Sequence, residues 1–512
     1  MGTSADQSAH RERTSFRRLG RDTFLYGAGI LLNRAVSFLM LPVYTRFLTT
    51  ADYGVLQLLD MTVDISHILF TAGMMAGVSL FYFQARDQQE RADIIRTAFV
   101  VEMILTAIGA SALFLLAPQI WQISLGGGGE VLFVRIAAVN FTLQMLTAVP
   151  MVLLQLQQRS HTVVLINFCR LLAQLSLNIL FVVVLREGVK GILLAGVIVN
   201  AVQGTALAFW VLRAARGRVR LAIVRQLRDF GVPYQLSTAG AFVLSFGDRY
   251  FLQASRGAAV VGLYGLAYQF GFLLHQLSTE QVLKAWNPQR LQLLHEPREE
   301  RDARYARGFG YYNLILITMA TGIGLFVRPV IQVMTTAPFH PAAELVPIIL
   351  VAYILQGWGS VTQFGIAVSR QTKYLSYASW ISVGVVLVLY ATLIPRWGGL
   401  GAALATVGAF LVRFLLQYRW AQRLWPVDYG WERNLRLAAY GAMVVTAAFV
   451  LPVAGIVGRS VLGAALLAIY GGLTWTTILH ETDRALVLAA LRSPRSLMSV
   501  FRGPPVPDRA TS

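Results

Sequence analysis

Residues Tyr374–Ile394 read YLSYASWISVGVVLVLYATLI, a run without a single charged side chain. A helix of about 20 apolar residues is long enough to cross the hydrocarbon core of a bilayer. About 14 runs of this kind follow one another along the chain, and only short segments separate them. The sequence therefore predicts an all-α, polytopic membrane protein with about 14 transmembrane helices.

The composition agrees with this prediction. Mean hydropathy is +0.58 and charged residues make up 13% of the chain, whereas soluble domains carry about 25%. The net charge is +19, and most of the 44 Lys and Arg residues fall in the two tails and in alternate loops. The positive-inside rule then places both termini in the cytoplasm. Because topology explains these charges, no nucleic-acid partner is expected.

A weak internal repeat suggests how the spans are grouped. Residues 51–56 (ADYGVL) at the start of the second span resemble residues 260–264 (VVGLY), which begin a span six spans later. An even number of spans per repeat places the pseudo-two-fold axis along the membrane normal. The predicted parts are a basic cytoplasmic tail (1–22), a six-helix N-lobe (23–212), a basic cytoplasmic interlobe loop (213–229), a six-helix C-lobe (230–423), two further helices (433–479) and a disordered cytoplasmic tail (480–512).

Polar residues inside the spans recur at helical spacing. Asn167, Arg170, Gln174 and Asn178 share one face of their span, because residues three or four apart are neighbours on a helix. A charge at the bilayer centre costs at least about 2.5 kcal/mol, so such residues normally face a partner or a cavity. Similar stripes on other spans are Asp60, Asp64 and His67; Asn140, Gln144 and Thr147; Gln269, Gln276 and Glu280; and Gln356, Ser360 and Gln363. Together they predict a hydrated cavity between the lobes.

Structural roles for some of these charges stay open. Arg34 is close enough in sequence to pair with Asp60 or Asp64 across the first two spans, and Glu280 can pair with Lys284 one turn away. The chain has one cysteine, Cys169, and neither a Cys/His metal spacing nor a glycine-rich phosphate loop. No catalytic residue, metal or cofactor is therefore predicted, although a membrane-embedded acid/base enzyme is not excluded by the charges alone.

Several segments carry a family resemblance along nearly the whole chain. They are Gly27–Arg46 followed by LTTADYG (48–54); FGVP (230–233) followed by SFGDRYFL (245–252); VGLY (261–264) through AWNP (285–288); and RQTKY (370–374) followed by IPRWGGLGAA (394–403). In order and spacing these segments resemble the Wzx-like polysaccharide flippases of the multidrug/oligosaccharidyl-lipid/polysaccharide (MOP) exporter superfamily. The chain departs from the family at Trp397, which is followed by two glycines where a simple loop glycine is commoner.

The resemblance implies a flippase, and not an enzyme, in the bacterial inner membrane. Its expected substrate is a polyprenyl-pyrophosphate-linked oligosaccharide, which moves from the cytoplasmic to the periplasmic leaflet for lipopolysaccharide or exopolysaccharide synthesis. A polysaccharide polymerase and glycosyltransferases are the implied partners, and an ion gradient or the membrane potential would drive alternating access.

Roles for the intramembrane residues follow from this reading as expectations. Arg34, Arg170 and Arg249 are expected to bind the pyrophosphate by charge-assisted hydrogen bonds. Expected sugar contacts are Asn167, Gln174, Asn178, Gln276 and Gln356, and expected ion-coupling residues are Asp60, Asp64 and Glu280. The alternative is a cation-coupled multidrug exporter of the same superfamily, which is expected to have an acidic, aromatic cavity without central arginines. A purely structural membrane scaffold is disfavoured, because its buried charges would cost stability without use.

Overall fold

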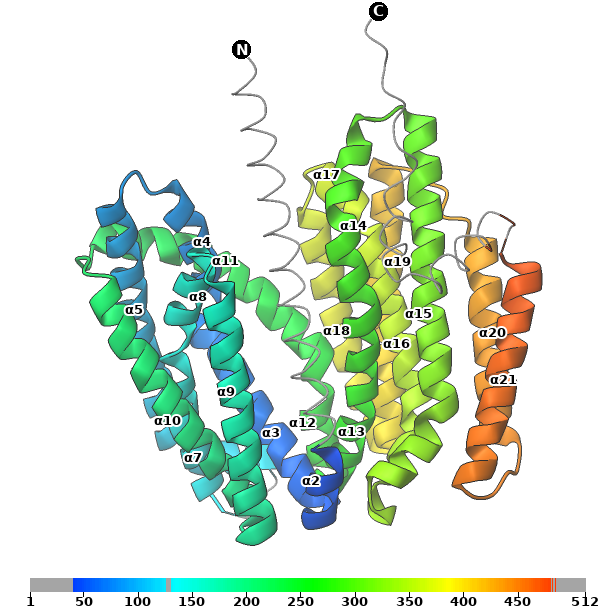
Figure 1. Cartoon of the computed structure of the whole chain (residues 1–512), viewed down its shortest axis with the longest axis horizontal. Coiled ribbons are helices and arrows are strands. Elements are labelled where there is room, and N and C mark those ends of the chain that lie inside the picture. The colour runs from blue at the N-terminus through cyan, green and yellow to red at the C-terminus, as the bar shows by residue number, and fades with distance from the viewer. Residues whose placement is uncertain (1–39, 126–129, 480, 482–483, 485–512) are drawn as a thin grey trace, which may run out of the picture. The chain divides into compact units, whose positions relative to one another are not determined.

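The computed structural model describes residues 40–125, 130–479, 481 and 484. Arg34 and most of the predicted first span lie outside these residues. The described chain is helical and contains no β-strand (Figure 1). It divides into two compact units, Met1–Gly262 and Leu263–Ser512.

The first unit consists of α-helices interrupted at two points by a wider π-helical turn. Its elements are α2 (Leu41–Phe47), α3 (Thr50–His67), the π-helix η1 (Ile68–Ala72), α4 (Gly73–Gln84), α5 (Gln88–Leu115), α6 (Ala117–Leu125), α7 (Leu132–Met145), α8 (Ala148–Leu156), α9 (Ser160–Asn178), the π-helix η2 (Ile179–Val184), α10 (Gly188–Ala214), α11 (Leu221–Phe246), α12 (Asp248–Arg256) and the beginning of α13 (Ala258–Leu274).

Local sequence explains where α3 begins and how η1 is supported. The Thr49 hydroxyl accepts a hydrogen bond from the Asp52 amide at 3.1 Å, and the Asp52 carboxylate accepts one from the Thr49 amide at 2.9 Å. This reciprocal arrangement is a capping box. A π-helical turn leaves carbonyl groups without their usual partners. The Gln235 amide nitrogen of α11 donates to two of them, Ile68 O at 2.9 Å and Leu69 O at 2.7 Å.

The basic loop between α10 and α11 is fixed to α5 by a buried aspartate. Asp93 is completely buried, accepts a hydrogen bond from the Arg218 amide at 2.7 Å and pairs with the Arg220 guanidinium at 2.5 Å. The Thr97 hydroxyl, one turn further along α5, accepts from the Arg220 amide at 3.1 Å. The part of this loop up to Arg220 is therefore anchored to the first unit and does not hang free as a linker.

The second unit continues from α13 and contains the long helices of the C-terminal half. Its elements are the π-helix η3 (His275–Glu280), α14 (Gln281–Gln292), the 3₁₀-helix η4 (Leu293–His295), α15 (Arg298–Met334), the 3₁₀-helix η5 (Ala337–Phe339), α16 (Ala342–Thr362), α17 (Phe364–Val368), α18 (Lys373–Trp397), α19 (Gly399–Leu424), α20 (Trp431–Val450) and α21 (Ile456–Thr477). Helix α15 packs against α16, α20 and α21 (Figure 1).

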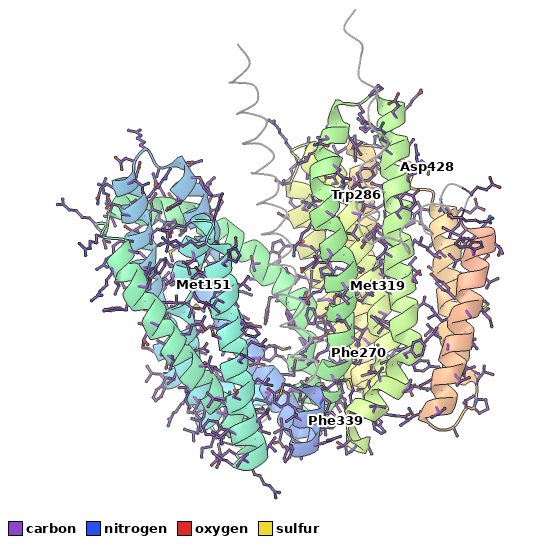
Figure 2. All side chains as sticks on the ribbon, viewed as in Figure 1. Met151, Phe270, Trp286, Met319, Phe339 and Asp428 are labelled. Atoms are coloured by element: carbon purple, nitrogen blue, oxygen red, sulfur yellow. The ribbon has the colours of Figure 1, made fainter. Side chains whose placement is uncertain are left out.

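An aromatic cluster closes one end of the second unit around the buried Arg290. Its guanidinium lies 4.5 Å from the ring centre of Phe364 and 5.1 Å from that of Trp286, and it donates to the Tyr305 hydroxyl at 3.3 Å. Tyr305 in turn donates to Val361 O at 2.9 Å. Trp286 on α14 and Phe270 on α13 are each 3% exposed and mark the buried side of these helices (Figure 2). The cluster ties α14, α15 and α17 together.

The prediction of an all-α, polytopic membrane protein is confirmed. The part of the chain that the structure describes holds ten helices that are long and apolar enough to cross a membrane. Their outward side chains are apolar: Leu165 is 60% exposed and Val202 68%, as expected of residues that face lipid. The figure of 14 spans, the two six-helix lobes and the domain limits stay predictions; in the structure, α11 and α12 belong to the first compact unit.

Two helices are longer than the apolar runs that predict them. The run of uncharged residues 308–327 (GFGYYNLILITMATGIGLFV) lies within α15 (Arg298–Met334), whose first turns carry Arg298, Arg301 and Asp302. The side chain of Asp302 pairs with the Arg298 guanidinium at 3.7 Å and with that of Arg301 at 2.8 Å. Helix α19 likewise continues past Tyr418, where its apolar run ends, to Leu424. Hydropathy marks the membrane-embedded part of a helix, whereas polar side chains pairing along its surface extend it into water.

Candidate functional site

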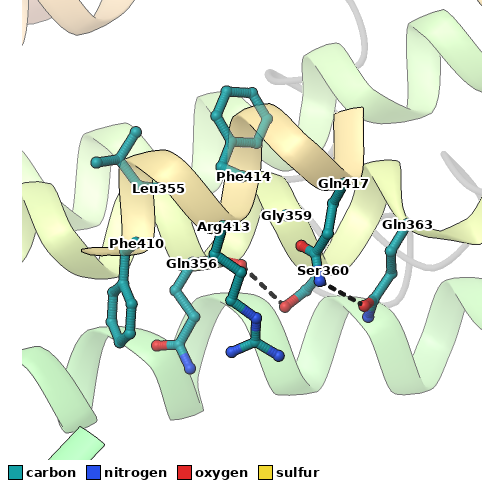
Figure 3. A pocket seen from close by; sticks show the side chains of 9 residues that line it. All are labelled: Leu355, Gln356, Gly359, Ser360, Gln363, Phe410, Arg413, Phe414 and Gln417. Atoms are coloured by element: carbon teal, nitrogen blue, oxygen red, sulfur yellow. Dashed lines mark hydrogen bonds between the residues drawn. The ribbon is translucent and has the colours of Figure 1, made fainter. Parts of the chain in front are cut away.

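A small polar pocket lies between α16 and α19 of the second unit. Gln356 and Ser360 line it from α16, Gln363 lines it from the turn directly after α16, and Arg413 and Gln417 line it from α19 (Figure 3). The pocket has a volume of about 60 Å³, enough for water molecules or one small ionic group. Its remaining lining residues are Leu355, Gly359, Phe410 and Phe414. The predicted stripe of Gln356, Ser360 and Gln363 therefore lines a pocket inside the second unit, whereas the predicted cavity between the lobes stays a prediction.

The amide side chains of this pocket are organised by hydrogen bonds. Gln417 donates to the Gln363 side-chain oxygen at 3.4 Å, and the Ser360 hydroxyl donates to the Gln356 backbone oxygen at 2.9 Å (Figure 3). Gly359 makes room for this arrangement, because a Cβ atom there would lie 2.7 Å from the Gln417 Oε1 atom. The pocket thus presents several amide groups, which can donate to or accept from sugar hydroxyls.

Arg413 is the charged residue that lines the pocket. Its guanidinium points into the cavity beside Gln356 (Figure 3). Among the residues that the structure describes, no carboxylate pairs with it, and its Nε atom is buried without a hydrogen-bond partner. A positive charge within a membrane span is expensive unless something offsets it. An anionic group is the ligand that this environment lacks.

Sequence reasoning missed Arg413. Its position in the sequence does not separate it from the arginines that follow, such as Arg419 and Arg423, although it lies within the membrane span of α19. The signal was its spacing: Arg413 and Gln417 are one helical turn apart, as are Gln356 and Ser360 on α16. Two stripes on neighbouring helices enclose the pocket, whereas only the α16 stripe was recognised.

In the first unit, the predicted stripe on α9 forms a hydrogen-bonded chain. Gln174 donates to the Asn178 side-chain oxygen at 3.0 Å, and Asn178, which is buried, donates to the Tyr44 hydroxyl of α2 at 2.7 Å. Asn167 and Arg170 continue the same face, and both are half-buried. Arg170 forms no ion pair within the described residues. This face therefore carries a second unneutralised cation next to amide groups.

Arg249 is in a different environment from Arg170. Helix α11 ends at Phe246 and α12 begins at Asp248, so Arg249 lies in the first turn after this joint. Its side chain is 1% exposed; its Nη1 atom lies 3.0 Å from Asp248 Oδ1 and donates to Ser245 O at 3.1 Å. The guanidinium also lies 5.2 Å from the ring centre of Phe246. Binding an anion would require this buried ion pair to open.

The predicted acidic residues have exposed side chains. Asp60 and Asp64 are exposed on α3 of the first unit. In the second unit, Glu280 ends η3 and pairs with Lys284 at 3.4 Å, both side chains being well exposed. Gln276 lies half-buried in the same π-helix. Arg34 lies outside the described residues, so its pairing with Asp60 or Asp64 remains open. The described part of the chain contains no cluster of three His, Cys, Asp or Glu residues suited to a metal ion.

Comparison with known proteins places this arrangement in a family. A family model described as polysaccharide biosynthesis protein matches residues 19–288. No curated protein sequence matches the chain. Among solved structures, the lipid II flippase MurJ in an inward closed conformation is 9% identical with a TM-score of 0.70, covering 88% of this chain and 99% of its own.

Multidrug transporters share the fold as well. An inward-facing multidrug resistance MATE family transporter of the MOP superfamily is 15% identical with a TM-score of 0.63, covering 76% of this chain and 94% of its own. A MATE structure in complex with MaL6 is 16% identical with a TM-score of 0.55, covering 78% and 94%. The TM-scores of these superpositions show a common fold, and the family match covers more than half of the chain. The chain therefore belongs to the polysaccharide biosynthesis protein family and has the fold of the MOP superfamily transporters.

Proposed function

We propose that this protein flips a polyprenyl-pyrophosphate-linked oligosaccharide from the cytoplasmic to the periplasmic leaflet of a bacterial inner membrane, with both termini in the cytoplasm. The observation that carries the proposal is the guanidinium of Arg413, which lies unneutralised among amide side chains inside a membrane span. The membership of the polysaccharide biosynthesis protein family supports it, as does the fold shared with the lipid II flippase MurJ.

The substrate has two chemical parts that match the two kinds of side chain. Arginine binds a pyrophosphate through charge-assisted, often bidentate hydrogen bonds, which are about twice as strong as neutral ones. Arg170 and Arg413 are the primary candidates, because neither has a carboxylate partner in the described chain. Arg34 and Arg249 are further candidates when accessible. The candidate sugar contacts are the amide residues Asn167, Gln174 and Asn178 in the first unit and Gln276, Gln356 and Gln417 in the second.

The driving force is assigned to acidic residues whose side chains are exposed on their helices. Asp60 and Asp64 are exposed on one helix, α3, and Glu280 has only a surface ion pair with Lys284. Binding of a proton or a sodium ion at one of these carboxylates would favour one conformation over another by its differential affinity for the two. A polymerase and glycosyltransferases would respectively use and supply the lipid-linked sugar.

Multidrug export is the second candidate, since the exposed acidic pair on α3 and the fold shared with multidrug transporters fit a cationic drug. Complementation separates the two functions. In a host lacking its own flippase for a surface polysaccharide, the wild-type chain is expected to restore the polymer and to clear lipid-linked precursor from the cytoplasmic leaflet. Restored drug resistance without any effect on the precursor would support the exporter instead.

A further inference from the structure

Glu102 is a buried acid that the proposed substrate site does not use. It lies within α5 and is 0% exposed, and neither carboxyl oxygen has a hydrogen-bond partner among the described residues. One turn further along the same face, the Thr106 hydroxyl is also buried and unpartnered. A carboxylate in such surroundings is strongly disfavoured unless it is paired, so the neutral acid is the favoured form.

Helix α5 packs against a neighbouring transmembrane span that is broken into two helices. The span Leu132–Leu156 is interrupted between α7, which ends at Met145, and α8, which begins at Ala148. The Thr147 hydroxyl and amide both donate to Gln144 O, at 2.7 and 3.0 Å, which satisfies that carbonyl at the joint. Helix α10 packs closely here, because a Cβ atom at Gly204 would lie 2.6 Å from Leu143 O.

The break places the amino end of α8 beside the part of α5 that carries Glu102. The amides of Ala148 and Val149 have no acceptor inside the helix, and Pro150 has no N–H to contribute. Val149, together with Leu146 at the joint, packs in one apolar cluster with Phe99 and Met103 of α5, which flank Glu102. A helix amino end favours negative charge. The site therefore offers the carboxylate two donors and a favourable dipole, while the apolar surroundings favour the acid.

We propose that Glu102 and the amino end of α8 form a proton-binding site that couples protonation to opening of the α7–α8 break. With the break closed, the protonated acid is buried. When the break opens, the carboxyl releases its proton to water, and the carboxylate accepts hydrogen bonds from Ala148 and Val149. Reclosing requires that a proton be taken up again. A single carboxylate does not provide the several oxygen ligands that a metal cation requires, so the ligand is a proton.

The titratable side chains on the helices around α5 do not neutralise Glu102. The elements that pack against α5 are α4, α6, α7, α8, α11 and η1. Their titratable residues are Tyr82, Arg135, Arg225, Arg228, Asp229 and Tyr234. Arg135 is exposed and lies over the ring of Phe114, three turns away from Glu102 along α5, and Arg228 pairs with Asp229 at the surface. No ion pair reaches Glu102 within the described residues.

The test uses the full-length protein in nanodiscs and needs no substrate, so its outcome is independent of the proposed function. Amide hydrogen exchange of residues 144–152 is measured against pH and corrected for the intrinsic rate with a peptide from α10. We expect the corrected exchange of the wild type to rise as Glu102 ionises, by up to about tenfold per pH unit, because the ionised fraction grows at that rate below the midpoint.

The isosteric variant Glu102→Gln mimics the protonated acid and is expected to hold the break closed across the pH range. Glu187→Gln, at an exposed pair with Lys190, is the control and is expected to retain the wild-type profile. Infrared spectra are expected to show one protonated-acid band, absent from Glu102→Gln. A pH-independent wild-type exchange, or a wild-type spectrum with Glu102 ionised at neutral pH, would overturn the proposal even if the variant failed to fold.

Discussion

Gly54 and Gly262 face each other where α3 crosses the first turns of α13. A Cβ atom at Gly54 would lie 1.9 Å from Ala258 O, and one at Gly262 would lie 2.0 Å from Thr50 O. Each glycine therefore meets the backbone of the other's helix, and no side chain separates the two. The two residues also occupy matching positions in the internal repeat, within ADYGVL and VVGLY.

Replacing either glycine by alanine is expected to force these two helices apart. Because the obstacle is backbone and not a flexible side chain, we expect Gly54→Ala and Gly262→Ala each to lower the free energy of unfolding by about 1–3 kcal/mol. The measurement is thermal unfolding of the purified protein in detergent. Gly384→Ala on α18 is the matched control, since nothing lies within 4 Å of its added Cβ; it is expected to be neutral or stabilising by up to about 1 kcal/mol. Equal effects at all three positions would refute the close crossing.

The buried pair of Asp248 and Arg249 is expected to be structural. Removing one partner of a buried ion pair takes its compensating charge away from the other, which costs about 3–5 kcal/mol. Arg249→Met is therefore expected to destabilise the protein strongly, and the double variant Asp248→Leu/Arg249→Met is expected to recover much of the loss. A double variant no more stable than the single one would show that the two residues do not act as a pair.

Asp93 is expected to hold the basic loop in place. Asp93→Ala leaves the Arg218 amide without its acceptor, which costs about 1–3 kcal/mol, and amide exchange in residues 215–220 should rise. Asp229→Ala is the control, because its ion pair with Arg228 is exposed and a surface change of this kind alters stability by about 0.5 kcal/mol or less. Unchanged exchange in Asp93→Ala would contradict the anchoring role.

Arg413 is expected to be required for export but not for membrane insertion. Losing its charge-assisted hydrogen bonds to an anion should reduce export roughly tenfold to hundredfold in Arg413→Gln, from about 1.5–3 kcal/mol of binding energy. Arg413→Lys should restore part of the activity, since it keeps the charge but not the planar fork. Polymer yield is compared at equal protein level in the membrane. Arg419→Gln, exposed on the same helix, should export normally; equal losses at both positions would contradict the pocket's role.

The sequence was sufficient for the membrane fold and for contacts between near neighbours. Apolar runs predicted the spans, and the i,i+4 spacing of Glu280 and Lys284 predicted the pair that the structure contains. Contacts between distant residues left no such signal: Asn178 donates to Tyr44, 134 positions away. Likewise, composition alone did not separate Arg413 from the loop arginines near it, because only the length of α19 and the position of α16 turn it into a pocket residue.

Buried groups held by broken helices were also out of reach. The sequence alone shows Glu102 as a charge inside an apolar run. The helix end near it, at the start of α8, exists only because the neighbouring span is broken at Leu146 and Thr147. An apolar run in the sequence predicts one continuous helix, because a short break in the helix hardly changes the mean hydropathy of the run. The structure is therefore needed to show which intramembrane charges meet free backbone groups.

The central claim, that unpaired arginines in the spans bind the pyrophosphate of a lipid-linked sugar, is tested most directly by a flipping assay. Proteoliposomes containing a polyprenyl-pyrophosphate-linked oligosaccharide with a fluorescent sugar are reconstituted with wild type, Arg419→Gln or Arg170→Gln/Arg413→Gln. For wild type and Arg419→Gln we predict that the labelled lipid leaves the inner leaflet rapidly, so that an external quencher removes its fluorescence. For the double variant we predict little loss of fluorescence. Flipping by the double variant at the wild-type rate would contradict it.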